Sequence, residues 1–146
     1  MLNCQIAAIV ADALAKKAPI VALESTIITH GMPWPQNLDM AKSVESCVRE
    51  AGATPATIAV IDGVLKIGLS AADLTQLAQT KNAAKLSRAD LALCMAQKKT
   101  GATTEIYQLH TTSKTKQTFL DSCLLFHTSK TPRPCWSFRL LNTHVR

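Results

Sequence analysis

The sequence predicts an α/β protein in which helices pack on both faces of a sheet, in three layers. Short apolar runs such as Ile20–Leu23 and Thr57–Ile61 have the length and unbroken hydrophobicity of strands buried in a sheet. They alternate with longer segments in which apolar residues recur every three or four positions, the pattern of amphipathic helices. The chain has 146 residues, 47% of them hydrophobic, which is enough for one globular domain.

Each predicted element rests on such a run and on the residues that bound it. Helices are predicted over residues 5–17, 36–51, 71–79 and 88–98, strands over 20–23, 57–61 and 64–67, and a short extended segment over 83–86. A polar loop is predicted between the strand 20–23 and the helix 36–51. Asp62-Gly63 is typical of a tight turn, so the strands on either side of it should form a hairpin.

Polar residues at the helices add detail to this prediction. Ser70 with Asp73, and Ser87 with Asp90, have the spacing of a capping box at the start of a helix. Glu45 belongs to the polar side of the helix 36–51, which we expect to face solvent.

The last part of the chain differs in character. Residues 105–146 follow no sustained helical or strand period and hold six Lys and Arg against two Asp and Glu. Residues 1–104 hold ten against eight, so most of the net charge of +6 lies in this tail. We expect residues 1–104 to form the domain and the basic tail to be poorly ordered. The tail has no recognised nucleic-acid-binding motif, and we expect no nucleic-acid partner. An alternative exon or a shifted reading frame would explain the change, and the genomic exon order tests this hypothesis.

The cysteines and the longest apolar runs bear on location. The five cysteines are scattered, with no C-x-x-C pair, which favours reduced thiols in a cytoplasmic protein over a disulfide framework or a zinc site. A mitochondrial location stays open. No apolar run approaches the roughly 20 residues of a membrane span, so no membrane partner is expected.

Glu24 is the first candidate for chemistry, because it directly follows the buried run 20–23. A carboxylate there is costly to desolvate unless it has a partner or a function, and partial burial suits a general acid or base. The structural alternative is a carboxylate that caps the helix starting at Gln36, or that pairs with Lys66 or Lys85. We expect His30, in the same loop, to be a loop residue and not a catalytic base.

A second group of candidates could bind an anion. Lys85 follows an extended segment and precedes a helix start, where its ammonium group, Ser87, Arg88 and free backbone N–H groups could hold a phosphate. The alternative is a lysine that is simply exposed to solvent. Gly101-Ala102-Thr103-Thr104 could add backbone amides and the hydroxyls of Thr103 and Thr104.

Several motifs in one order carry a resemblance to a known family. The motifs are VALESTIITHGMPWPQN, PATIA, IDG, AKLSR and GATT, and they cover residues from about 8 to 104. They resemble the pseudouridine-5'-phosphate glycosidase family. The resemblance implies an α/β/α glycosidase domain, here truncated, that reversibly cleaves a C–C glycosidic bond to uracil and ribose 5-phosphate. It also implies that Glu24 is the proton donor, that Lys85 contacts the sugar phosphate, and that the family uses manganese.

The resemblance also implies residues for which this chain offers no match. The nucleophilic lysine and the metal-binding aspartate of the family lie beyond GATT, and neither Lys114, Lys116 and Lys130 nor Asp121 stands in the required context. Metal ligands are therefore not assigned. Two hypotheses follow: a glycosidase by family, with a sugar phosphate or nucleotide as ligand, or a non-catalytic truncated isoform that associates with full-length subunits. Homo-oligomers are expected, because missing strands would leave a sheet edge unpaired and leave the strands 20–23 and 57–61 incompletely buried.

Overall fold

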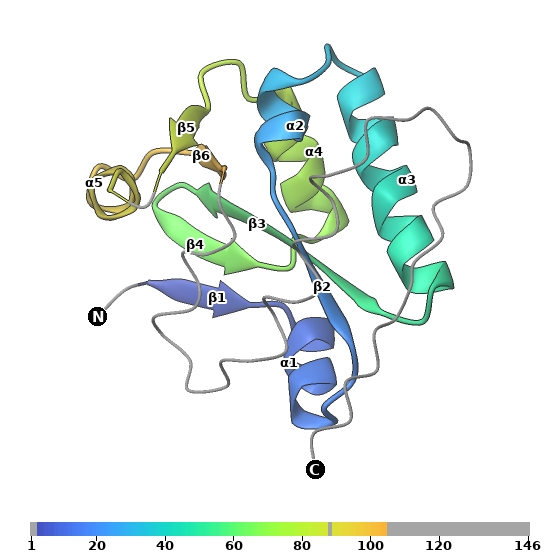
Figure 1. The fold of residues 1–146 in the computed structure, drawn as a ribbon. Helices are drawn as coiled ribbons and strands as arrows, with labels where there is room; N and C mark the ends of the chain where they lie inside the picture. Colours follow the sequence, from blue (N-terminus) through green and yellow to red (C-terminus); the bar gives the residue numbers. More distant parts are fainter. Residues whose placement is uncertain (1–2, 88, 105–146) are drawn as a thin grey trace.

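One strand, β3 (Thr54–Ile61), organises the sheet because other strands pair along both of its edges. The computed structural model describes residues 3–87 and 89–104. Within them β3 pairs in parallel with β2 and antiparallel with β4 and β6, while β1 pairs with β4 and β5 with β6, both in parallel. The result is a six-stranded mixed sheet (Figure 1). The bounds of the other strands are Cys4–Ile6 (β1), Ile20–Leu23 (β2), Val64–Ile67 (β4), Ala84–Leu86 (β5) and Gly101–Thr103 (β6).

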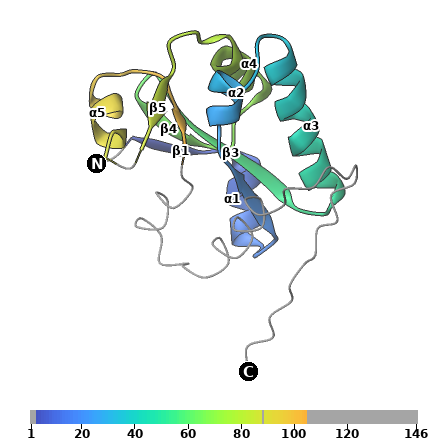
Figure 2. The same cartoon turned by 45° about the horizontal axis from the view of Figure 1, so that its top comes forward.

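Helices cover both faces of this sheet, as predicted. They are α1 (Ala8–Ala15), α2 (Thr26–His30), α3 (Gln36–Glu50), α4 (Ala71–Gln79) and α5 (Leu91–Ala96). Figures 1 and 2 show α2, α3 and α4 together on one side of β3 and α1 on the other. The alternation of side chains along β3 matches this arrangement. Ala59 and Ile61 pack with α2, α3 and α4, whereas Ile58 and Val60 pack with Cys94 of α5. The predicted α/β architecture is confirmed.

The first predicted helix was too long. Residues 4–6 are not helical but form β1. Hydrogen bonds on either side of it hold it against β4: Leu65 N–H donates to Asn3 O at 3.0 Å, and Ala7 N–H donates to Ile67 O at 2.9 Å. The local apolar spacing fits a helix equally well. Pairing with β4 decides the outcome, because the edge of β4 offers backbone groups that a helix would leave unpaired.

The predicted polar loop after Glu24 was also partly wrong. Residues Thr26–His30 form the short helix α2, so His30 ends a helix and does not lie in a loop. Similarly, the predicted helix 88–98 is shorter, because α5 begins only at Leu91. Ser87 and Asp90 bond to each other in a turn before it, and hydrogen bonds from Ser87 hold the pKa of Asp90 below its ordinary value.

Burial corrects two further expectations. Every residue from Thr57 to Ile61 is buried, so the expected incomplete burial of this strand is wrong, whereas three of the four residues of β2 are half-buried. Glu45 does not face solvent: it is 7% exposed. Its carboxylate accepts hydrogen bonds from Thr57 Oγ1 at 2.6 Å and from Arg49 at 2.7 Å. These two donors compensate for taking the charge out of water.

The predicted capping box at the start of α4 is present. Asp73 N–H donates to Ser70 Oγ at 3.1 Å, and Ser70 N–H donates to Asp73 Oδ2 at 3.2 Å. Lys66 donates to the other oxygen of the same carboxylate. Burial favours the neutral carboxyl, but the hydrogen bonds from Lys66 and Ser70 together outweigh it and hold the pKa of Asp73 below its ordinary value.

We expect Asp73 to make stability depend on pH under acid conditions. Its pKa is lower in the folded chain than in the unfolded one, where it lies near 3.8. Its contribution is therefore fully present above about pH 5 and is lost as the pH falls through the folded-state value. Urea unfolding of the wild type and Asp73→Asn measures this. The difference in free energy of unfolding should stay constant from about pH 7 to 5 and shrink below about pH 4. A difference that is still unchanged at about pH 3 would contradict the prediction.

Candidate active site

The carboxyl ends of β2 and β6 meet along one edge of β3. Leu23 of β2 is in register with Thr57, and Ala102 of β6 is in register with Ala59, so the two strands approach Ile58 from opposite directions. Ser25 N–H donates to Thr103 O at 3.3 Å and joins the two ends. The polar residues that follow β2 therefore lie beside those that end β6. We call this place the strand-end junction, defined by residues 24–26 and 103–104.

Glu24 lies half-buried at this junction, and its carboxylate contacts α2. Its Oε2 accepts a hydrogen bond from Thr26 N–H at 2.9 Å. A carboxylate at the first turn of a helix satisfies an N–H group that has no partner within the helix. The sequence suggested structural roles toward Gln36, Lys66 or Lys85, but the contact is to a different helix, and Lys66 is bonded to Asp73. The second oxygen of Glu24 accepts no hydrogen bond from any other described residue and is available for chemistry.

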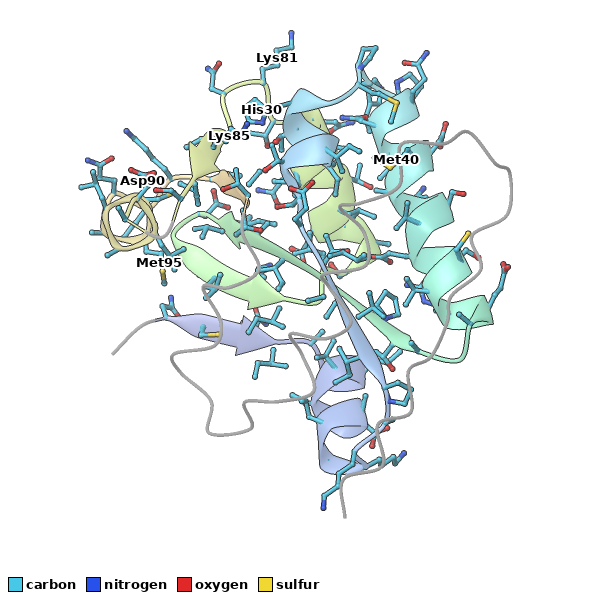
Figure 3. All side chains as sticks on the ribbon, viewed as in Figure 1. His30, Met40, Lys81, Lys85, Asp90 and Met95 are labelled. Carbon is cyan, nitrogen blue, oxygen red and sulfur yellow. The ribbon has the colours of Figure 1, made fainter. Side chains whose placement is uncertain are left out.

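Lys85 reaches the same region from β5. It is in register with Ala102, which is in register with Ala59, so it belongs to the face of the sheet that α2 covers. The side chain is exposed and has no ion pair or hydrogen bond to any other described residue. In Figure 3, Lys85 and His30 are seen at the same end of the molecule, between α2 and β5. The ammonium group of Lys85 is therefore free to meet an anion.

The hydroxyl-bearing candidates lie close by but differ in their contacts. Thr104 Oγ1 donates to Leu86 O at 2.9 Å, which places it beside the end of β5. Ser87, one residue further on, is half-buried and bonded to Asp90. Thr103 is 3% exposed and donates to Ile58 O at 2.9 Å. Arg88 lies outside the described residues. The roles of all four in binding stay predictions.

Ser25 was not among the predicted site residues, although it lies at the centre of the junction. It is fully buried, and its hydroxyl bonds to both β3 and β6. The available signal was its position, directly after the candidate acid at the end of a buried strand.

A cavity of about 370 Å³ lies elsewhere, at the far end of α2. Its lining residues are Thr29, Met32, Pro33, Trp34, Asn37, Ala78, Gln79, Thr80 and Lys81, and none of them is a predicted site residue. The polar floor of this cavity is satisfied, because Asn37 Nδ2 donates to Ile28 O and to Ala78 O, both at 2.8 Å. His30 lies nearby, with its Nδ1 2.6 Å from Thr29 Oγ1. We therefore place the candidate site at the strand-end junction, which contains Glu24 and lies beside β5, the strand that carries Lys85.

The described residues were also compared with the requirements of a metal site and of a membrane-spanning helix. In the part of the chain that the structure describes, no group of three His, Cys, Asp or Glu side chains is placed to hold a metal ion. The aspartate that the resemblance implies as a manganese ligand would follow Thr104, outside the described residues. Among the described helices, none has the length and hydrophobicity needed to cross a bilayer.

Fold and geometry together define a class: an α/β protein whose acid, lysine and hydroxyl side chains gather where strands end, the usual place of ligand sites in such sheets. The model of one family, described as indigoidine synthase A like protein, matches residues 9–114. The chain belongs to this family. The match extends ten residues beyond Thr104, where the quoted motifs end.

Similar proteins agree with this assignment. The chain is 67% identical over 95 residues to a pseudouridine-5'-phosphate glycosidase of Roseobacter denitrificans, covering 65% of this chain and 31% of the relative. It is 60% identical over 95 residues to the glycosidase of Staphylococcus aureus, with the same coverage. The resemblance drawn from the motifs is confirmed. The chain spans about a third of the length of these curated relatives.

Two solved structures share the fold. One is a prealnumycin C-glycosynthase in complex with ribulose 5-phosphate, with a TM-score of 0.62 and 36% identity, covering 71% of this chain and 33% of that one. The other is an indigoidine synthase A-like protein from Thermotoga maritima, with a TM-score of 0.56 and 27% identity, covering 61% and 30%.

Proposed function

We propose that the strand-end junction binds a pentose phosphate and is the front part of a pseudouridine-5'-phosphate glycosidase site. The observation that carries the proposal is that Glu24, which follows β2, and Thr104, which follows β6, lie where these two strands meet, beside the strand β5 that carries Lys85. The glycosidase relatives, and the glycosynthase solved in complex with ribulose 5-phosphate, support this ligand class. The reaction would be reversible cleavage of the C–C glycosidic bond to uracil and ribose 5-phosphate.

Each residue has a proposed role in this site. Lys85 binds the phosphate as a charge-assisted donor. Ser87, Arg88, Thr103 and Thr104 are further proposed substrate-binding residues on the basis of the sequence motifs AKLSR and GATT. Glu24 donates a proton to the base as the glycosidic bond breaks, through the oxygen that Thr26 does not occupy.

The chain by itself is proposed to bind without turnover. Neither the nucleophilic lysine nor the manganese-binding aspartate that the resemblance implies has a sequence match here, and the members of a catalytic unit are strongly non-additive. The second candidate function is therefore a non-catalytic protein that associates with catalytic members of the family or with copies of itself. The free cysteines Cys4, Cys47 and Cys94 support a cytoplasmic location for either form.

Titration of the purified chain with ribose 5-phosphate tests the binding proposal. Lys85→Ala should weaken binding roughly 10- to 100-fold, because a hydrogen bond to a charged group contributes about 1.5–3 kcal/mol. Glu24→Gln should leave the affinity within about threefold, because the acid is needed only when the bond breaks. The matched control is Lys42→Ala, since Lys42 is an exposed lysine of α3.

Two outcomes would contradict the proposal. If the wild type and Lys85→Ala bind ribose 5-phosphate with equal affinity, Lys85 on β5 does not bind the phosphate. The second outcome is that this chain releases uracil from pseudouridine 5'-phosphate and that Glu24→Gln abolishes the release. It would show that the chain is catalytic and supplies its own nucleophile.

A further inference from the structure

Ser25 has the environment of a residue that holds other residues in place. It is 0% exposed, and a fully buried hydroxyl is costly unless its hydrogen-bonding capacity is used. Here it is used in both directions. Ser25 Oγ donates to Ile58 O of β3 at 2.6 Å and accepts from Thr103 N–H of β6 at 3.0 Å.

These two bonds connect strands that no backbone ladder connects. β2 and β6 do not pair with each other within the described residues; each pairs with a different part of β3. Their relative position therefore depends on the few bonds across the junction. One is from Ser25 N–H to Thr103 O at 3.3 Å and another from Thr26 Oγ1 to the same oxygen at 2.9 Å. The Ser25 hydroxyl adds the shortest bond of the group, to Ile58 O at 2.6 Å, and its two bonds join the end of β2 to both β3 and β6.

Glu24 takes its position from this arrangement. Its backbone is joined to Ser25 on one side, and its carboxylate is bonded to Thr26 N–H. Lys85 takes its position from β6, through the parallel pairing of β5 with β6. The position of Glu24 relative to Lys85 therefore depends in part on the bonds that Ser25 makes to β3 and β6.

We propose that Ser25 is a positioning residue that couples the acid Glu24 to the strands carrying Lys85 and Thr104. The coupling matters for chemistry only if the proposed function holds, but the mechanical link itself does not depend on it. Removing the hydroxyl should leave β6 on β3, because Thr103 Oγ1 still donates to Ile58 O at 2.9 Å. Ser25→Ala should remove only the bonds of the hydroxyl to Ile58 O and from Thr103 N–H, and should leave the two bonds to Thr103 O in place.

The test compares Ser25→Ala with Thr57→Val by nuclear magnetic resonance. Thr57→Val also removes a buried hydroxyl bond next to Ile58, but on the α3 side of the sheet, so it controls for general destabilisation. In Ser25→Ala, hydrogen-exchange protection of the Thr103 amide should fall at least about tenfold relative to that of the Leu65 amide, because Thr103 N–H loses its acceptor. In Thr57→Val the two amides should keep their ratio.

A titration with ribose 5-phosphate supplies the readout that a merely structural role would not change. In the wild type, ligand should shift the amide resonances of Glu24, Thr26 and Thr104 together. In Ser25→Ala, Thr104 should still shift with an affinity within about threefold, whereas the shifts of Glu24 and Thr26 should become smaller, because only the bonds to Thr103 O still join them to β6. Unaltered protection at Thr103, or an unaltered response of Glu24 and Thr26, overturns the proposal. If the wild type shows no shifts at all, the proposed function fails, and the exchange comparison still decides the role of Ser25.

Discussion

Replacing Gly63 with alanine is expected to lower the free energy of unfolding by about 2–5 kcal/mol, a large part of the roughly 5–15 kcal/mol of a normal domain. Gly63 is in the turn between β3 and β4 and has φ +79°, where an L-residue costs about 1–2 kcal/mol. A Cβ there would also lie 2.7 Å from Met95 O and 2.8 Å from Lys98 Cα. Both are backbone atoms, so relief requires the end of α5 and the residues after it to move, and overpacking adds about 1–3 kcal/mol.

Gly52→Ala is the matched control for this prediction. Gly52 has φ +81°, nearly the same backbone conformation, but no atom lies within 4 Å of the position of its Cβ. Gly52→Ala should therefore lower the free energy of unfolding only by the cost of the backbone conformation, about 1–2 kcal/mol. Urea unfolding of both variants measures the difference. Equal losses would show that the hairpin and α5 are not in contact at Gly63.

Thr57→Val is expected to lower the free energy of unfolding by about 1–3 kcal/mol, the cost of leaving a buried polar group without its partner. Valine has nearly the shape of threonine but cannot donate to Glu45 Oε1, which Thr57 Oγ1 reaches at 2.6 Å. Arg49 still bonds the other oxygen but is itself about half exposed, so it compensates for little of the loss.

Ser46→Ala is the control for Thr57→Val on the same helix. Ser46 Oγ donates to Glu50 Oε1 at 3.1 Å on the exposed side of α3, and its removal should change stability by less than about 0.5 kcal/mol. Chemical denaturation at neutral pH compares the two. A loss in Thr57→Val no larger than in Ser46→Ala would mean that the Glu45 carboxylate is solvated in solution.

The candidate site could be predicted in part, because some of its residues have local signals. Glu24 stands directly after a buried apolar run, and Lys85 stands in an extended segment before a turn; the structure brings both to one region. The burial of Thr103 had no such signal. Whether a threonine near a strand end faces solvent or the core depends on which strand lies opposite, and for Thr103 that strand is β3, about half the described chain away in sequence.

The elements whose cause is local could be predicted from the sequence: the strands β2 and β3, the helix α3, the Asp62-Gly63 hairpin and the capping box of α4. Turn chemistry, capping and apolar period act over a few residues, so they can be recognised without the fold. Only the tertiary structure decided that residues 4–6 pair with β4, that Glu45 is buried against Thr57, and that β2 and β6 meet at Ser25. Each of these depends on a backbone or side-chain partner distant in the chain. The free energy of a buried polar group is set by whether that partner is present.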